Sequence, residues 1–268
     1  MRKTFEKNTF AKRIKSMLAV DFRRLFTSKL FYIMLGIALV VPVLILVMTT
    51  MMDGTVTKNP QTGVETVMEG FKNVWQIIGS PSNTGMAGMD MSLTAMCNVN
   101  MMYFAVAVFV CLFVTEDFRS GYAKNLFTVR AKKTDYVLSK TLVGFVTAIG
   151  IFVLFFIGAM IGGAVAGLPF EMEGFDLGNV VACVLAKIAL SMAFVAVPVL
   201  AGVIAKQKAW LSILLAMGIG MLFFTMIPMV TPLDASIVHV LLCLVGGGAF
   251  GVGLGAISNA VLKKTTLV

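Results

Sequence analysis

Residues 140–166 read KTLVGFVTAIGIFVLFFIGAMIGGAVA, and Lys140 is the only charged residue among them. An α-helix rises about 1.5 Å per residue, so about 20 apolar residues cross the roughly 30 Å hydrocarbon core of a bilayer. This stretch is long enough to cross with some tilt, and we therefore predict that it forms a membrane-spanning helix.

The rest of the chain has the same character: 59% of its 268 residues are hydrophobic, 13% are charged, and the mean hydropathy is +0.94. Soluble domains carry about 25% charged residues. The predicted spans are 30–51, 92–115, 140–166, 178–204, 210–230 and 236–261. The 29 residues before the first span are too long for a signal peptide and lead to no small-residue cleavage site. We predict an all-α membrane protein with six transmembrane helices, in which an N-terminal segment (1–29) precedes a transmembrane domain (30–268).

The positions of lysine and arginine predict the orientation of these spans. Nine lie in residues 1–29, six in residues 116–140, and two each at 206–208 and 263–264, which places nineteen on one side. The opposite side holds only Lys58 and Lys72, together with eight acidic residues. The basic side, with both termini, is therefore predicted to be cytoplasmic. The net charge of +9 is explained by this orientation and requires no nucleic-acid partner.

Two kinds of site have no support in the sequence. Four cysteines and a single histidine, His239, show no metal-binding spacing, so we expect no metal site. No GxxxxGK[ST] motif occurs, so the chain lacks the loop that cradles nucleotide phosphates.

The N-terminal segment carries an amphipathic pattern. Its apolar residues recur at three- and four-residue spacing: Phe10, Ile14, Met17, Leu18, Phe22, Leu25 and Phe26. Its charged residues occupy other positions of the same turns: Arg13, Lys15, Asp21, Arg23 and Arg24. This pattern predicts an interfacial helix with its basic face toward anionic headgroups. The alternative is a flank that only sets orientation.

The predicted cytoplasmic loop 116–139 begins EDFRSGYAKN. Phe118, Tyr122 and Leu126 recur every four residues, which predicts a short amphipathic helix at the membrane surface. Such a helix, held between two spans, could contact a soluble partner. The alternative is a solvated loop between two spans.

A basic interfacial helix, a span ending in Glu116-Asp117-Phe118-Arg119-Ser120-Gly121-Tyr122-Ala123-Lys124-Asn125, and the entry Tyr136-Val137-Leu138-Ser139-Lys140 together resemble the type-2 ABC transporter permease family. The resemblance covers roughly residues 10–145. It is closest to small bacterial permeases of peptide-antibiotic immunity and peptide export.

The resemblance implies a role for each cytoplasmic helix. The N-terminal helix would be the elbow helix, represented by Phe10, Ile14, Phe22, Arg23 and Arg24. The loop helix would be the coupling helix that docks on an ATPase, with coupling residues Glu116, Asp117, Arg119, Gly121, Lys124 and Asn125. ATP and magnesium would bind to a separate ABC ATPase subunit, and a second permease copy would complete the pathway.

The resemblance also implies a bacterial cytoplasmic membrane protein that exports or clears an amphipathic peptide or lipid-like molecule, as in antimicrobial peptide resistance. The alternative is a non-transporting scaffold or peptide sensor. One departure lies between the last two spans, where residues 229–236 leave little room for the re-entrant helices of the wider fold.

The long outer segment, residues 52–91, contains apolar residues at helical spacing: Val67, Met68, Phe71, Val74, Trp75 and Ile78. They predict a helix on the outer membrane face or over the outer mouth. An ordinary loop helix is the alternative.

Several residues within the spans are also candidates for a specific role. A lysine near mid-span is costly, so Lys187 is expected either to line a wet pathway or to be paired structurally. Asn98 and Asn100 are expected to line a cavity or to cap the second span. The glycines at four-residue spacing predict close helix packing: Gly158, Gly162, Gly247, Gly251 and Gly255.

Overall fold

The computed structural model describes residues 10–58, 65–80, 97–128, 132–172, 174–224 and 226–264, and they form a helix bundle. The α-helices are α1 (Phe10–Thr27), α2 (Lys29–Met52), α4 (Met102–Arg119), α5 (Tyr122–Thr128), α6 (Lys133–Ala166), α7 (Leu177–Ala205), α8 (Ala209–Phe224), α9 (Ile227–Val230) and α10 (Ile237–Lys264). The remaining elements are strands β1 (Val56–Lys58) and β2 (Glu65–Val67) and the 3₁₀ helices η1 (Val74–Ile77) and η4 (Val99–Met101).

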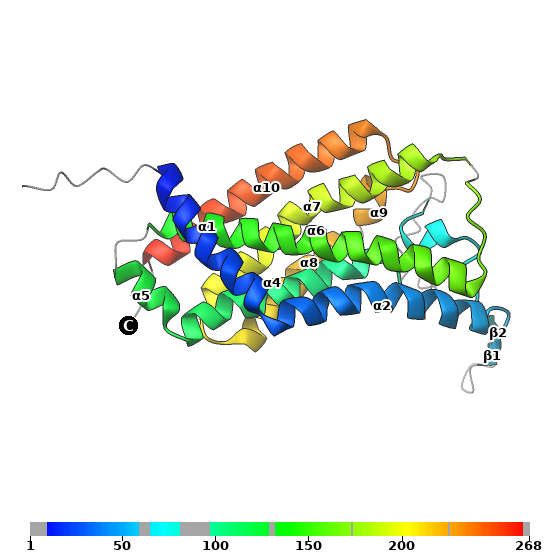
Figure 1. Cartoon of the computed structure of the whole chain (residues 1–268), viewed down its shortest axis with the longest axis horizontal. Helices are drawn as coiled ribbons and strands as arrows, with labels where there is room; N and C mark the ends of the chain where they lie inside the picture. The colour runs from blue at the N-terminus through cyan, green and yellow to red at the C-terminus, as the bar shows by residue number, and fades with distance from the viewer. Residues whose placement is uncertain are drawn as a thin grey trace, which may run out of the picture.

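The bundle has two distinct ends (Figure 1). We call the end with α1 and α5 the α5 end, and the end with β1 and β2 the hairpin end. The chain runs toward the hairpin end in α2, α6 and α8–α9, and returns in α4, α7 and α10. Lys133 Nζ donates a hydrogen bond to the Leu262 carbonyl at 2.5 Å, so the last turns of α10 lie beside the start of α6 at the α5 end.

Five described helices are long and apolar enough to cross a membrane: α2, α4 with η4, α6, α7 and α10. They correspond to five of the predicted spans, although α6 begins seven residues earlier than predicted, at Lys133, and residues 92–96 of the second span lie outside the described residues. The predicted span 210–230 is divided into α8 and α9. The 16 residues of α8 reach about 24 Å, so the sixth crossing stays a prediction.

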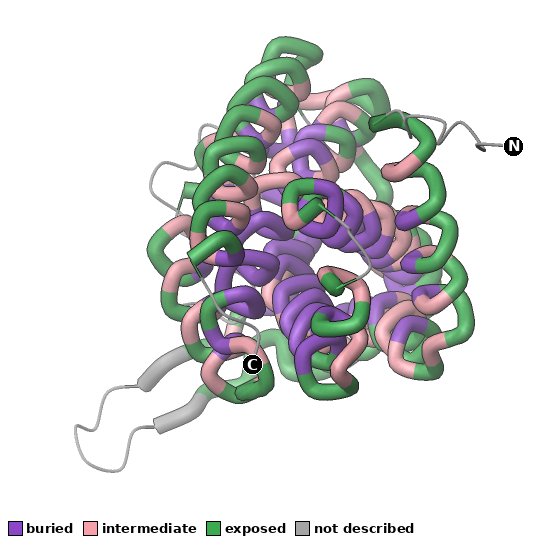
Figure 2. The backbone as a smooth tube through the Cα atoms, turned by 90° about the vertical axis from the view of Figure 1, so that its left-hand side faces the viewer, coloured by how far each residue is buried: buried purple, intermediate pink, exposed green. Residues whose placement is uncertain are grey.

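The core lies around α7, which contacts α4, α6, α8 and α10, while α2 packs along α6. Figure 2 shows buried backbone at the centre and exposed backbone on the outward sides of the helices. Many exposed residues of α2 and α10 are large and apolar, among them Ile37, Leu44, Val245 and Val252. In a bilayer these side chains would contact lipid tails.

The glycines predicted to allow close packing lie between helices. A Cβ on Gly158 would meet the Leu39 carbonyl oxygen and Pro42 of α2, and one on Gly162 would lie 2.7 Å from Val43 Cα. On α10, a Cβ on Gly247 would lie 2.8 Å from the Ala189 carbonyl oxygen of α7. Gly251 and Gly255 have more space, since their nearest neighbours would lie 3.6 and 3.8 Å away.

The predicted helix over residues 67–78 is wrong. Val67 ends the β1–β2 hairpin, and only Val74–Ile77 form a single 3₁₀ turn, capped by the Asn73 side chain. Gly70 separates the two parts, because its backbone lies against the Thr49 carbonyl and its N–H donates to Asp53 at 2.8 Å. The apolar residues between positions 71 and 78 are buried in the bundle: Phe71, Val74, Trp75, Ile77 and Ile78.

The connection from α9 to α10 is short, as the small number of residues between the last two predicted spans indicates, and it is largely buried. Thr231, Leu233 and Ala235 are at most 1% exposed. The Leu233 N–H donates to the Ser80 carbonyl at 2.9 Å, which joins this connection to the outer segment at the hairpin end.

Candidate functional site: a buried charge network at the α5 end

The side of α1 that faces the bundle carries charges. Met17, Asp21 and Leu25 are buried at four-residue spacing, and Arg24 is partly buried beside them. Asp21 and Arg24 are therefore on the bundle side, and not on a polar face toward headgroups as the apolar periodicity indicated. Phe10 and Phe26, by contrast, are about half exposed.

Two acidic and two basic side chains from three helices meet at this position. Lys140 of α6 places Nζ 2.7 Å from a carboxylate oxygen of Asp21 and 2.7 Å from one of Asp117 at the end of α4. Arg24 lies 2.6 Å from the other Asp117 oxygen and 3.7 Å from Asp21. Both carboxylates and the lysine are at most 1% exposed, whereas the Arg24 side chain is 29% exposed. The two charges of each sign therefore compensate one another in a largely buried cluster.

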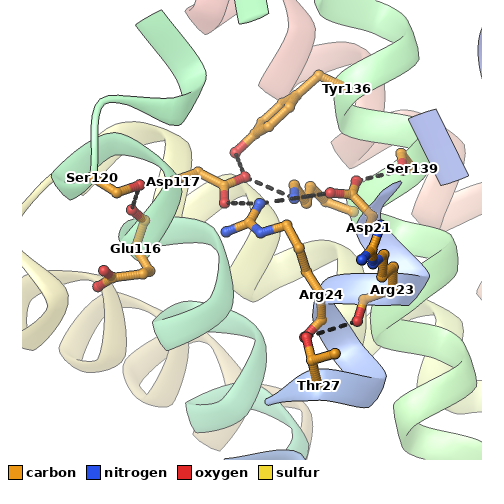
Figure 3. Close-up of polar contacts among 10 residues, drawn as sticks. Asp21, Arg23, Arg24, Thr27, Glu116, Asp117, Ser120, Tyr136 and Ser139 are labelled. Atoms are coloured by element: carbon orange, nitrogen blue, oxygen red, sulfur yellow. Dashed lines mark hydrogen bonds and ion pairs between the residues drawn. The ribbon is translucent and has the colours of Figure 1, made fainter. Parts of the chain in front are cut away.

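Hydroxyl groups of α6 complete this charge network, which we define as Asp21, Arg24, Asp117, Tyr136, Ser139 and Lys140. The Tyr136 hydroxyl donates to Asp117 at 3.0 Å, and the Ser139 hydroxyl donates to Asp21 at 2.6 Å. Figure 3 shows the labelled members converging from α1, α4 and α6. Outside the network, Arg13 pairs with Asp135 at 2.8 Å and so joins α1 and α6 a second time. The network therefore fixes α1 to the beginning of α6 and the end of α4.

The predicted single helix over residues 116–125 is divided in two. Residues up to Arg119 continue α4, and a new short helix, α5, begins at Tyr122. Gly121 makes the break with a φ of +77°, a left-handed conformation that glycine adopts without strain. Phe118 and Tyr122 therefore lie on different helices.

The structure divides the predicted coupling residues between interior and surface. Asp117 is buried in the charge network, where it contacts no solvent. Glu116 and Arg119 are exposed at the end of α4, and Lys124 and Asn125 are exposed on α5. Figure 3 shows the Glu116 carboxylate pointing away from the network. The surface available to another protein at this corner therefore excludes Asp117.

Aromatic contacts join α5 to the charge network. The Arg24 guanidinium carbon lies 4.5 Å from the centre of the Tyr122 ring, a cation–π contact. Burial would lower the pKa of Arg24, but the Asp117 and Asp21 carboxylates outweigh it, and the pKa is raised. Burial raises the pKa of Tyr122, and the same two carboxylates raise it further. At neutral pH the pair is therefore a guanidinium against a neutral phenol.

The sequence reasoning missed four members of this network: Asp21 in its buried role, Tyr136, Ser139 and Lys140. A signal was present for two of them. Lys140 is the only charge in residues 140–166, and Asp21 continues the spacing of Met17 and Leu25. An acid within a buried stripe and a lone cation within an apolar run need partners, but the pattern does not say which.

Lys187 is paired with neutral groups near the hairpin end. Its Nζ donates to Asn100 at 2.8 Å and to Thr231 at 2.9 Å, and its side chain is almost completely buried. Asn98 caps η4, since its side chain accepts from the Asn100 N–H. This arrangement joins η4, α7 and the connection after α9. Of the two uses expected for Lys187, the structure shows the paired one, while lining of a pathway stays a prediction.

A metal site is not evident in the part of the chain that the structure describes, where no three metal-binding side chains come together.

Comparison with known proteins places the chain in a family. No curated protein and no solved structure gave a significant match. Residues 17–223, well over half of the chain, match the model of a family described as ABC-2 family transporter protein. The matched region begins in α1 and includes the whole charge network, α5 and the helices through α8. The chain therefore belongs to the ABC-2 family of transporters and is a multi-pass membrane permease of an ABC transporter.

Proposed function

We propose that this chain is the membrane subunit of an ATP-driven exporter in a bacterial cytoplasmic membrane, and that α5 is its coupling helix. A separate ABC ATPase subunit would bind ATP and magnesium and would dock on α5. The family membership supports such a partner. The observation that carries the role of α5 is its attachment: a short helix with an exposed face, held through Tyr122 against the charge network.

The contacts of α5 with its neighbours could transmit a movement of α5 to α1 and α6. Ala123 is fully buried, and the Phe127 ring lies 5.4 Å from that of Tyr136 on α6 in an edge-to-face contact. Tyr122 contacts Arg24 of α1. A partner that displaces α5 would therefore act on α1 and on the start of α6 together. The exposed Lys124 and Asn125 are the residues we assign to the docking surface, with Glu116 and Arg119 at its border.

The orientation and cargo belong to the same proposal. The α5 end, with both termini, would face the cytoplasm, because basic residues are concentrated on the cytoplasmic side of membrane proteins. An apolar cavity of about 210 Å³ lies between α7, α9 and α10, and its lining includes Phe194, Ile227, Gly247 and Phe250. A lining of this kind suits an amphipathic peptide or a lipid-like molecule. Two permease copies, identical or different, would complete the pathway.

The direct test is recovery of the ATPase subunit with the tagged permease from native membranes. We expect a nucleotide-binding subunit to co-purify and its ATP hydrolysis to depend on the permease. Lys124→Glu reverses the charge of the exposed α5 surface, and we expect it to lower recovery of the subunit about tenfold.

The matched control is Lys208→Glu, which reverses an exposed charge in the turn between α7 and α8. We expect recovery to stay near the wild-type level with this variant. If wild-type protein recovers no nucleotide-binding subunit, the exporter proposal fails. If the two variants lower recovery equally, α5 is not the docking helix.

A second test concerns the break at Gly121. Gly121→Val introduces a β-branched residue at a φ of +77°, which costs about 1–2 kcal/mol locally. Nothing lies within 4 Å of the added Cβ, so strain and not collision is the cause. We expect α5 to be displaced and the stimulation of ATP hydrolysis to fall, with little change in thermal stability. Gly121→Asn tolerates this conformation better and should retain most of the stimulation. Equal loss in both variants would contradict a conformational role.

A further inference from the structure

A second cavity lies at the α5 end, outside the charge network. It has a volume of about 340 Å³ and is enclosed by the α1–α2 junction, α4 and the turn between α7 and α8. Its polar lining comprises Arg24, Ser28, Thr115, Glu116, Arg119 and Gln207, and its apolar lining comprises Leu30, Phe109, Leu112, Phe113 and Ala209. The cavity therefore combines charged groups with an apolar wall.

Two exposed aromatic residues mark the level of this cavity relative to a bilayer. Tyr32, at the start of α2, is 57% exposed, and Trp210, at the start of α8, is 65% exposed. Exposed tyrosine and tryptophan at span ends typically lie at the boundary between headgroups and acyl chains. The sequence neighbours of both residues line the cavity: Leu30 on α2 and Ala209 on α8. The cavity therefore lies at the depth of lipid headgroups.

The charges of the cavity are not all compensated by the protein. Arg24 is paired with Asp117 and Asp21. Within the described residues, neither the Glu116 carboxylate nor the Arg119 guanidinium forms an ion pair. An occupant of matching chemistry would offer an anionic group to Arg119 and a cationic group to Glu116, with hydrocarbon against Leu112 and Phe113.

We propose that this cavity binds one phospholipid with an amino headgroup, of the phosphatidylethanolamine type. Its phosphate contacts Arg119 and Gln207, since a guanidinium binds phosphate through two parallel hydrogen bonds. Its ammonium contacts Glu116, and the first part of an acyl chain packs on Leu30, Leu112 and Phe113. The bound lipid fills the space between the α1–α2 junction, α4 and the turn between α7 and α8. This site shares Glu116 and Arg119 with the border of the proposed docking surface. The two proposals can still fail separately, because lipid retention is measured without the ATPase subunit.

The test measures lipids retained by the purified protein. The protein is reconstituted into bilayers of equal parts phosphatidylethanolamine, phosphatidylglycerol and phosphatidylcholine, extracted in mild detergent, and examined by native mass spectrometry. We expect one phosphatidylethanolamine to be enriched. Leu112→Trp fills the cavity and should lower that retention about tenfold. Leu214→Trp is the matched control, because Leu214 is 60% exposed on α8 and does not line the cavity.

Charge variants test the headgroup assignment without enlarging any side chain. Arg119→Gln should lower retention, while Lys208→Gln, which removes an exposed cation outside the cavity, should not. Glu116→Gln removes the contact with the ammonium and should shift the preference from phosphatidylethanolamine to phosphatidylglycerol.

Several outcomes would overturn the proposal. Absence of phosphatidylethanolamine enrichment would do so, as would equal loss with Arg119→Gln and Lys208→Gln, which would indicate diffuse attraction to the basic end. An unchanged headgroup preference in Glu116→Gln would contradict the ammonium contact. If Leu112→Trp leaves lipid retention intact but weakens recovery of the ATPase subunit, the occupant is a protein segment and not a lipid.

Discussion

Asp117→Asn is expected to lower the free energy of unfolding by about 3–5 kcal/mol, the cost of removing one partner from a buried ion pair. Asp117 is fully buried and lies within 2.7 Å of both Lys140 and Arg24. Without its charge, these two cations share Asp21 alone, and one positive charge is left uncompensated away from water. The neutral amide keeps the size of the side chain, so the loss reports charge and not packing.

Three buried cysteines allow this loss to be measured. Cys111, Cys183 and Cys243 are free and buried, so a thiol-reactive dye reports unfolding as detergent-purified protein is heated. Glu171→Gln removes a carboxylate charge from an exposed side chain outside the network and both cavities, and should change the midpoint little. An equal shift in both variants would indicate a general charge effect and contradict the network.

The double variant Asp117→Leu with Lys140→Met sharpens this test. It removes one charge of each sign and leaves Asp21 with Arg24. Replacing a buried ion pair by apolar residues is often close to neutral, so the double variant should be more stable than Asp117→Asn alone. Strong non-additivity of this kind is the signature of direct coupling between neighbours. Additive losses would show that Asp117 and Lys140 stabilise the protein independently.

The lengths of the apolar runs predicted the long helices, because about 20 consecutive apolar residues are enough to cross a bilayer. The glycine spacing likewise indicated close packing, and the structure places Gly158 and Gly162 against α2. The charge network could not be derived in this way. Lys140 and Asp21 are 119 positions apart in the chain, and no local pattern states which distant charges will meet.

The two helical patterns that the structure corrects share one cause. On α1 the apolar residues indicated one face, but the bundle buries Asp21 because Lys140 and Ser139 satisfy it there. In residues 67–78 the apolar spacing indicated a helix, yet Val67 is exposed at the end of the hairpin. The later apolar side chains are buried although only a short 3₁₀ turn forms there: Phe71, Val74, Trp75 and Ile78. Tertiary packing determined both the buried face of α1 and the conformation of residues 67–78. Which side chains are buried depends on the neighbouring helices as well as on the spacing of apolar residues within the segment.

Gly158→Leu is expected to have the largest effect of the glycine variants, because it lies where α6 and α2 approach most closely. An added Cβ would meet the Leu39 carbonyl oxygen and would lie 2.7 Å from Pro42 Cγ. A backbone oxygen cannot move aside by changing a rotamer, so α2 must separate from α6. Overpacking costs about 1–3 kcal/mol for small additions and more when backbone must shift. We therefore expect Gly158→Ala to lower stability within that range.

Gly158→Leu should reduce the yield of folded protein severely, because its whole side chain would have to enter the contact with α2. Gly253→Leu is the matched control, since Gly253 lies on α10 with nothing within 4 Å of an added Cβ. It should fold normally. The measurement is the monodisperse yield in size-exclusion chromatography, followed by the thiol-dye midpoint for each variant that folds. Gly158→Leu and Gly253→Leu proteins of equal yield and midpoint would show that α2 is not held closely against α6, and that these glycines do not determine the packing of the bundle.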